Sequence, residues 1–257
     1  MSAISLDRPR PSAGLFIRGL LFSLGMILAT VLWGPVVLLS FPLSLHRRYW
    51  IATRWAAFVL WWLRITCGIR HRIRGLENLP PGPAIILAKH QSTWETLLLP
   101  LLFRPLAIVL KRELLWVPVF GWALALIKPV AIDRSSGKAA LRQVIERGQV
   151  HLRTGQWVLL FPEGTRTAPG TRRRYHIGGA ALAAESGYPI VPVAHNAGLF
   201  WPRRSFFKRP GTVEVVIGPV IDSHGRSPHE LLAAAEDWIE QTVAEISGLP
   251  VPPLAKH

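Results

Sequence analysis

The chain begins with a long apolar stretch. From Gly19 to Leu45 no charged residue occurs, and these 27 residues as one helix would extend about 40 Å, more than the hydrocarbon core of a bilayer, about 30 Å. Gly34-Pro35 and Phe41-Pro42 interrupt the stretch, and arginines stand on both sides of it. Positive charge at both ends favours a helical hairpin or a re-entrant element with both ends cytoplasmic over a single crossing.

A second apolar run, from Tyr49 to Ile69, carries Arg54 and Arg64 among four tryptophans. That mixture is typical of an interfacial helix or of a poorer transmembrane helix. A buried core hairpin is the alternative, and the absence of a polar face in residues 19–45 argues against it. We therefore expect residues 1–75 to form an N-terminal membrane-associated helical hairpin.

After Gly75 short runs rich in β-branched residues alternate with segments of helical periodicity. The runs predict strands at Ala84–Ala88, Ala107–Leu110, Pro129–Ile132, Trp157–Phe161, Ile190–Ala194 and Val213–Ile217. Helices are predicted at Lys138–Arg153, at Ile177–Ser186 and around the apolar positions between Leu231 and Ile246. Alternating strands and helices predict an α/β domain over residues 76–248, in which helices flank a sheet, followed by a frayed tail, residues 249–257.

The net charge of the chain limits the classes of partner that it could bind. Thirty Lys and Arg stand against fifteen Asp and Glu, a net charge of +15, so an anionic bilayer, phosphorylated substrates or nucleic acid could each be bound. Ten arginines and a single acid, Asp7, precede Glu77, and arginine beside tryptophan is typical of a membrane interface. The one cysteine, Cys67, excludes an internal disulfide, and no cluster of His, Cys or carboxylates has the spacing of metal ligands.

The first motif with catalytic chemistry is His90-Gln91-Ser92-Thr93-Trp94-Glu95. If Ser92 or Thr93 caps a helix that begins near Trp94, Glu95 lies in the first turn and can reach the imidazole of His90. The carboxylate would then hold one ring nitrogen and leave the other as a base. The same residues also match a capping box, in which Glu95 would bind the backbone instead.

The second motif, Phe161-Pro162-Glu163-Gly164-Thr165-Arg166, follows a predicted strand. A glycine turn lets backbone amides approach a phosphate, and a guanidinium binds phosphate through two hydrogen bonds, so Glu163, Gly164, Thr165 and Arg166 are candidates for binding a phosphorylated acceptor. A plain turn with a solvated arginine is the alternative. Lys111 and Arg134 are further candidates for phosphate binding, or are exposed cations at strand ends.

A third notable segment, residues 199–209, interleaves aromatic residues with Arg203, Arg204, Lys208 and Arg209. Such a loop suits lipid headgroups or the phosphates of coenzyme A, and it also suits stacking on single-stranded nucleic acid. No G-x-S-x-G motif occurs, which argues against a serine hydrolase. His151, His176 and His195 have no partner at a suitable spacing, so structural or surface positions are expected for them.

These motifs, taken in order, resemble the glycerolipid acyltransferase family. His90 through Glu95 matches the His-x4-Asp motif of that family, with Glu in place of the usual Asp, and residues 161–166 match its third motif closely. The second motif corresponds to Lys111-Arg112-Glu113, Pro118–Gly121 and Ile132-Asp133-Arg134, and the fourth to Ile190-Val191-Pro192-Val193. The resemblance implies a glycerol-3-phosphate acyltransferase-like fold with a mixed central sheet.

The resemblance also implies a reaction. An acyl group would pass from acyl-CoA or acyl carrier protein to the sn-2 hydroxyl of lysophosphatidate, with His90 as the base, Glu95 as its orienting carboxylate and no cofactor. Membrane lipid is an expected partner and nucleic acid is not, and the expected location is the cytoplasmic face of the inner (plasma) membrane. Glu95→Asp would keep substantial activity because it restores the family pattern, and Arg166→Ala would mainly weaken acceptor binding.

Two classes of alternative stay open at this point. The same chemistry could act on another acceptor, such as a different lysophospholipid, a lyso-aminolipid or glycerol-3-phosphate. The chain could instead be a non-enzymatic basic module that binds a membrane or nucleic acid, in which the motifs are only turns and helix caps. Salt-dependent binding to DNA or RNA without thioester turnover would support the second class.

Overall fold

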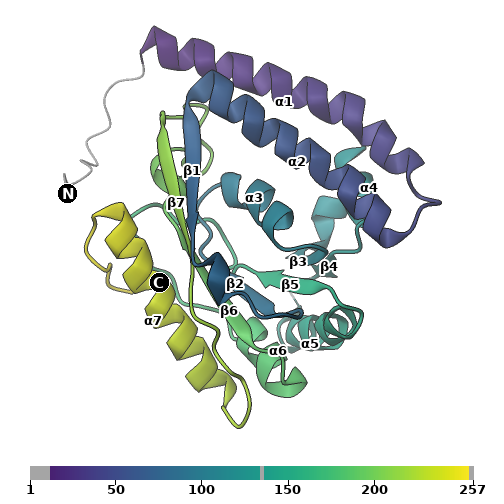
Figure 1. The fold of residues 1–257 in the computed structure, drawn as a ribbon, viewed down its shortest axis with the longest axis vertical. Coiled ribbons are helices and arrows are strands. Elements are labelled where there is room, and N and C mark those ends of the chain that lie inside the picture. Colours follow the sequence, from purple (N-terminus) through teal and green to yellow (C-terminus); the bar gives the residue numbers. More distant parts are fainter. Residues whose placement is uncertain (1–11, 134–135, 255–257) are drawn as a thin grey trace.

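A mixed seven-stranded sheet forms the centre of the protein, whose computed structural model describes residues 12–133 and 136–254 (Figure 1). The strand order is β1-β7-β6-β2-β5-β3-β4, and every neighbouring pair is parallel except β6 and β7. The strands are β1 (Ile69–Arg74), β2 (Ile85–Ala88), β3 (Leu106–Lys111), β4 (Val130–Ile132), β5 (Trp157–Leu160), β6 (Ile190–His195) and β7 (Gly211–Ile217).

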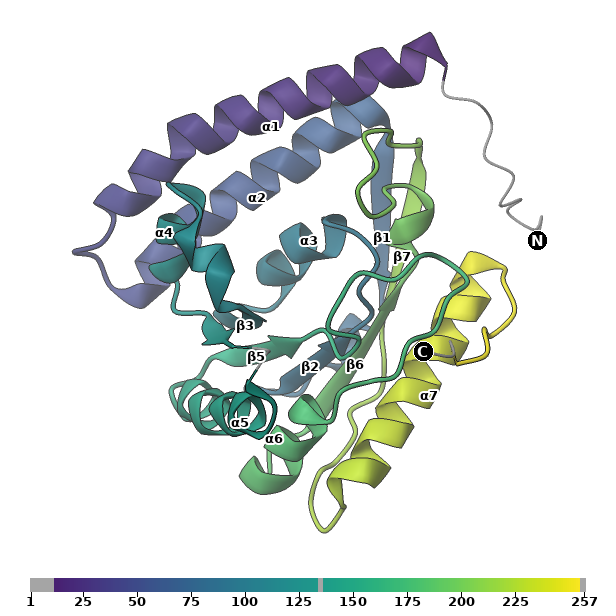
Figure 2. The same cartoon turned by 180° about the vertical axis from the view of Figure 1, so that it is seen from behind.

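Helices cover both faces of the sheet, and the central strands are apolar on both faces for that reason. Ile86 and Ala88 of β2 pack on the face that carries α2 and α3, whereas Ile85 and Leu87 pack on the face that carries α5, α6 and α7 (Figures 1 and 2). The helices are α1 (Ala13–Leu39), α2 (Leu45–Cys67), α3 (Trp94–Leu102), α4 (Phe120–Ala125), α5 (Lys138–Arg153), α6 (Gly178–Ser186) and α7 (Pro228–Ser247).

The N-terminal part of the chain is a helical hairpin. Helices α1 and α2 lie side by side and are joined by a short turn that contains Phe41-Pro42, as the sequence predicts (Figures 1 and 2). Gly34-Pro35, the other predicted break, lies inside α1 instead. Gly34 is in contact range of Val119, next to α4, so close packing explains the small residue at this point. The hairpin thus consists of the apolar helix and the arginine- and tryptophan-rich helix together.

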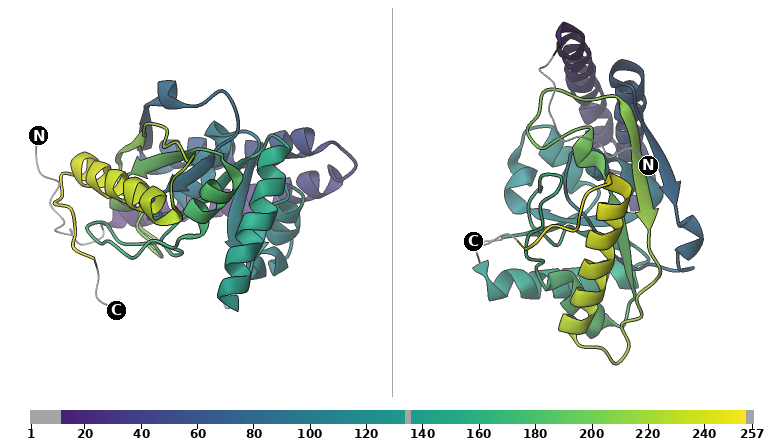
Figure 3. Two further views of the ribbon diagram at one scale, coloured as in Figure 1. Left: turned by 90° about the horizontal axis from the view of Figure 1, so that it is seen from below. Right: turned by 90° about the vertical axis from the view of Figure 1, so that its left-hand side faces the viewer.

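Helix α1 lies on the outside of the molecule. It is long and apolar enough to cross a membrane, with a mean hydropathy of 2.1 over its best window, and only 11% of that window is buried. The core helix of a soluble protein would be mostly buried, whereas α1 buries only Gly19, Phe22, Gly34 and Val37, so its composition and its exposure together indicate membrane association. Figure 3 shows the hairpin at one end of the molecule and α5 and α6 at the other.

The boundary that the sequence predicts after residue 75 does not separate two packing units. Strand β1 lies before it and pairs in parallel with β7, and Tyr49, Val59 and Leu63 of α2 share a core with the sheet. The sequence pattern does not predict strand β1, because β1 is an edge strand whose residues, Ile-Arg-His-Arg-Ile-Arg, are mostly exposed and basic. The hairpin is therefore continuous with the α/β domain rather than appended to it.

The remaining elements match the sequence closely. All six predicted strands are present, with ends that differ by at most two residues, and the three predicted helices correspond to α5, α6 and α7. Helix α4 and a preceding 3-10 turn (Arg112–Trp116) were not predicted. In the expected tail, Leu254 forms an isolated bridge with Arg172, so residues 249–254 return along the domain.

Candidate active site

The motif residues gather at one edge of the sheet because several strands end there in parallel. His90 follows β2, Phe161 follows β5, and Lys111 ends β3, which pairs with β5. His195 ends β6, on the other side of β2. Segments about 70 residues apart in sequence are thus brought together by strand pairing alone.

His90 and Glu95 form the expected pair. Helix α3 begins at Trp94, which returns Glu95 to the first turn, and His90 Nδ1 lies 2.8 Å from Glu95 Oε1. The same oxygen accepts hydrogen bonds from the backbone N–H groups of Gln91 (2.9 Å) and Ser92 (2.8 Å). The orienting role and the backbone-capping role, which sequence reasoning left as alternatives, are both present in one carboxylate oxygen.

The electrostatics of this pair define the state of the imidazole. Burial alone would raise the pKa of Glu95, but the nearby His195 and the hydrogen bonds and charge of His90 outweigh it, so the pKa lies below its usual value. The ionised carboxylate only accepts, so Nδ1 of His90 carries the proton. In the described part of the chain Nε2 has no hydrogen-bond partner, and it is free to act as a base.

The ring of Phe161 stacks on the imidazole of His90, with centroids 4.1 Å apart and planes tilted by 17°. Together with the bond to Glu95, this contact fixes both the position and the plane of the ring. His195 supports the pair from behind: it is fully buried, its Nε2 donates to the carbonyl of Lys89 at 2.7 Å, and it lies 3.9 Å from Glu95 Oε2. Burial lowers the pKa of His195, and its Nδ1 accepts a hydrogen bond from the backbone N–H of Ala197 at 3.3 Å, which requires the neutral form.

The side chain of Glu163 does not line the cavity beside His90, which differs from the position expected for an acceptor-binding residue. Its side chain is buried, and Oε2 accepts a hydrogen bond from the backbone N–H of His90 at 2.9 Å. The backbone N–H and the hydroxyl of Thr167 both donate to the carbonyl of His90, at 2.8 and 3.1 Å. The loop after β5 therefore holds the backbone of the loop after β2, and Glu163 fixes the position of His90.

A buried charge network lies behind Glu163. Lys89 Nζ contacts Glu163 Oε1 at 3.0 Å and Glu240 Oε1 of α7 at 2.6 Å, and the hydroxyl of Tyr175 also donates to Glu240. Burial raises the pKa of Glu163 to about 7, although the charge of Lys89 opposes the shift. Sequence reasoning missed Lys89, Tyr175 and Glu240. The available indications were a lysine at the end of an apolar strand and an acid beside the apolar stripe of α7.

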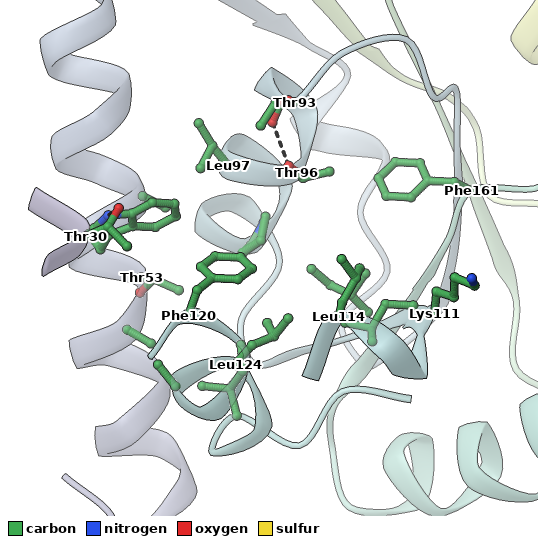
Figure 4. A pocket seen from close by; sticks show the side chains of 18 of the residues that line it. Thr30, Thr53, Thr93, Thr96, Leu97, Lys111, Leu114, Phe120, Leu124 and Phe161 are labelled. Atoms are coloured by element: carbon green, nitrogen blue, oxygen red, sulfur yellow. Dashed lines mark hydrogen bonds between the residues drawn. The ribbon is translucent and has the colours of Figure 1, made fainter. Parts of the chain in front are cut away.

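An apolar cavity of about 570 Å³ opens next to His90, between α3, α4 and the hairpin. Figure 4 shows Thr30, Thr53, Phe120 and Leu124 around it, with Phe161 and Lys111 on the side opposite Thr30. His90, Lys111, Gly164, Thr165 and Arg166 all line this cavity, so five of the predicted site residues meet there. Glu95 and Glu163 lie behind it, and Arg134 lies outside the described residues.

Gly164 provides the turn that brings Arg166 to the cavity. Its N–H donates to the carbonyl of Phe161 at 2.9 Å, and its φ of +66° is in the left-handed region that favours glycine. Arg166 is partly buried, and its pKa is lowered by burial and by Arg203, while Glu95 raises it. Lys111 is more exposed and forms an ion pair with Glu113 at 3.3 Å. The site therefore combines a base, a cationic side and an apolar side.

Known proteins share both the sequence and the fold. A family model described as Acyltransferase matches residues 70–196. The 1-acyl-sn-glycerol-3-phosphate acyltransferase of Pseudomonas aeruginosa is 49% identical over 236 residues, which cover 90% of this chain and 92% of that protein. The 1-acyl-sn-glycerol-3-phosphate acyltransferase alpha of Mus musculus is 31% identical over 66% of this chain and 61% of its own length.

The crystal structure of the 1-acyl-sn-glycerophosphate acyltransferase of Thermotoga maritima has the same fold, with a TM-score of 0.74 at 24% identity. The match covers 93% of this chain and 97% of that one, so it includes the hairpin as well as the sheet. The expected fold class is thereby confirmed. By its sequence and its fold, the chain belongs to the acyltransferase family that includes the 1-acyl-sn-glycerol-3-phosphate acyltransferases.

Proposed function

We propose that the protein transfers a fatty acyl group from an acyl thioester to the sn-2 hydroxyl of lysophosphatidate, giving phosphatidate. The observation that carries the proposal is the bond of 2.8 Å between His90 and Glu95 beside a cavity that has both a cationic and an apolar side. The relative from Pseudomonas aeruginosa, at 49% identity over nearly the whole chain, supports the same acceptor.

The site residues suggest how the reaction proceeds. His90 Nε2 accepts the proton of the acceptor hydroxyl as that oxygen attacks the thioester carbonyl, and Glu95 stabilises the imidazolium that forms. The tetrahedral intermediate then releases the thiolate, which takes the proton from His90, so the base is regenerated. A single ester bond forms, a single thioester bond breaks, and no acyl-enzyme is required.

The two sides of the cavity suit the two parts of the substrates. Ala56, Leu97, Phe120 and Leu124 offer apolar surface for an acyl chain, whose burial contributes about 0.8 kcal/mol per methylene. Arg166 and the turn at Gly164 offer a guanidinium and backbone amides for the phosphate of the acceptor, with Lys111 as a further cation.

The hairpin explains how the substrates reach this cavity. Trp33, Gly34 and Val37 of α1 line it, so a membrane-associated helix forms part of its wall. We infer that lipid enters from the bilayer at the cytoplasmic face of the inner membrane, where acyl-CoA and acyl carrier protein are found. Arg47 and Arg48, at the start of α2, suit contact with anionic headgroups at that face.

Thiol release from long-chain acyl-CoA in mixed micelles, with and without lysophosphatidate, tests the proposal. Wild-type protein should release thiol only with the acceptor, and His90→Ala should lose this activity. His224→Ala is a matched control, because His224 also pairs with a carboxylate, Asp222 at 2.6 Å, but on the surface. Release that persists in His90→Ala would contradict the mechanism, and release with acyl carrier protein alone would identify the donor.

A further inference from the structure

The loop between β6 and β7, residues 200–209 and here called the basic loop, is fixed to α1 at its base. The Lys208 side chain is buried, and its Nζ lies over the rings of Phe22, Trp201 and Phe206 at 4.9, 5.2 and 5.4 Å. The ring of Phe206 also packs against Phe16. Cation–π and aromatic contacts therefore hold the loop at a defined position beside the hairpin.

The tip of the basic loop reaches the catalytic cavity. Arg203 and Arg204 both line it, and Arg203 Nη1 donates to the backbone carbonyl of Arg166 at 3.2 Å. Arg204 has a φ of +57°, which costs a non-glycine residue about 1 kcal/mol. Strain of this kind persists where surrounding contacts fix the backbone, as the base of the loop does here. The tip thus places Arg203 against the turn that carries Arg166, with Arg204 in the lining of the same cavity.

The cations at this side of the cavity have no acidic neighbour in its lining. Among the described residues that line the cavity there is no Asp or Glu, whereas Lys111, Arg166, Arg203 and Arg204 all line it. Lys111 has its own ion pair with Glu113, but within residues 12–133 and 136–254 the three arginines have none. Arg203 lowers the pKa of Arg166, so these two cations repel each other, and Arg204 adds a third positive charge to the lining of the same cavity. A bound anion with more than one negative charge would stabilise them.

We propose that Arg203 and Arg204 act with Arg166 to bind a terminal phosphomonoester, and that they select lysophosphatidate over lysophospholipids whose phosphate is a diester. The inference rests on the proposed function and specifies its acceptor. A phosphomonoester carries a charge of about −1.5 to −2 at neutral pH and three free oxygens, enough for three guanidinium groups. A phosphodiester carries one charge and two free oxygens, and its second substituent would occupy the place of one arginine.

Steady-state kinetics of Arg203→Gln, Arg204→Gln and the double variant test this inference, with lysophosphatidate and lysophosphatidylglycerol as acceptors. We expect KM for lysophosphatidate to rise about tenfold or more in the double variant, because charge-assisted hydrogen bonds are lost, with little change in kcat. KM for the diester acceptor and for acyl-CoA should change less than about threefold. The matched control is Arg209→Gln, which removes the same charge from the same loop but does not line the cavity.

The possible results separate this inference from the proposed function. If Arg166→Ala raises KM for lysophosphatidate and the double variant does not, the selectivity role is refuted while the proposed function stands. If Arg166→Ala has no effect on that KM either, the acceptor site itself is wrongly placed. A rise in KM for acyl-CoA alone would assign the arginines to the phosphates of the donor. An equal loss with both acceptors, with weaker binding to anionic vesicles, would assign them to the membrane surface.

Discussion

Glu95→Asp is the substitution for which the structure and the family pattern lead to opposite expectations. Aspartate is the usual residue of the family motif, so the pattern predicts retained activity. In the structure, however, one glutamate oxygen accepts hydrogen bonds from His90, Gln91 and Ser92, all between 2.8 and 2.9 Å. The glutamate side chain of Glu95 therefore has the length that this backbone needs to make all three hydrogen bonds.

The size of the effect follows from the geometry. Removing one methylene withdraws the carboxylate by about 1.5 Å, so a bond of 2.8 Å would become about 4.3 Å if the backbone did not move, which is beyond hydrogen-bonding range. Hydrogen bonds to a charged group contribute about 1.5–3 kcal/mol each. Since a positioned base contributes about 10²–10⁴ to the rate, we expect Glu95→Asp to lower kcat about 100-fold and Glu95→Gln by more.

Thiol release in mixed micelles at saturating acyl-CoA measures this effect, with kcat and KM for lysophosphatidate determined separately. His90→Ala gives the activity that remains without the base, against which the other variants are compared. The melting temperature of each variant shows whether it is folded. The KM should change little, because Glu95 lies behind His90 rather than in the cavity. A Glu95→Asp enzyme with kcat within about threefold of wild type would refute the reasoning and show that the loop after β2 moves to meet the shorter side chain.

Further predictions concern the buried network and the cavity. Because the pKa of Glu163 is about 7 in the folded protein, above its unfolded value, its contribution to stability is present at low pH and is lost as pH rises through about 7. Between about pH 4.5 and 7, melting temperatures should fall with rising pH in wild type and not in Glu163→Gln; identical slopes would contradict this reasoning. Lys89→Met should lower the free energy of unfolding by about 3–5 kcal/mol, since it leaves two buried carboxylates without their cation, whereas Arg142→Ala, which breaks an exposed pair with Glu146, should cost less than about 1 kcal/mol. Ala56→Trp, which fills part of the cavity, should shift the preferred acyl donor to shorter chains, and an unchanged chain-length profile of kcat/KM would place the acyl chain elsewhere.

Local patterns were sufficient for much of this fold. The central strands are apolar on both faces and bounded by turns, and α5 and α7 have clear helical periodicity, so their sequences indicate them without tertiary information. Strand β1 could not be found in this way, because only its pairing with β7 makes its basic sequence extended. Pro35 was predicted to interrupt a helix, but α1 continues through it to Leu39.

Within the site, sequence spacing was sufficient to predict a contact where both residues are close in the chain, as with His90 and Glu95. It was insufficient for Glu163, whose carboxylate would suit an exposed turn equally well and is buried only because Lys89 and Glu240 surround it. Glu240 lies 151 residues from Lys89, on a helix that packs on the opposite face of the sheet from α3. Such contacts depend on how the elements pack, and no local pattern encodes them.

The hydrogen bonds that join the loop after β5 to the backbone of His90 bear on which hydroxyl is acylated. Glu163 and Thr167 hold His90 at its N–H and its carbonyl, and Arg166 lies between them in sequence. His90, the proposed base, and Arg166, the proposed phosphate-binding arginine, are thus held by the same hydrogen-bonded pair of loops. On a glycerol phosphate the sn-2 oxygen is one carbon closer to the phosphate than the sn-1 oxygen. The distance between the two loops therefore favours the sn-2 hydroxyl of lysophosphatidate over the more distant sn-1 hydroxyl of glycerol-3-phosphate, so the choice of acceptor depends on how the two loops are joined as well as on the base.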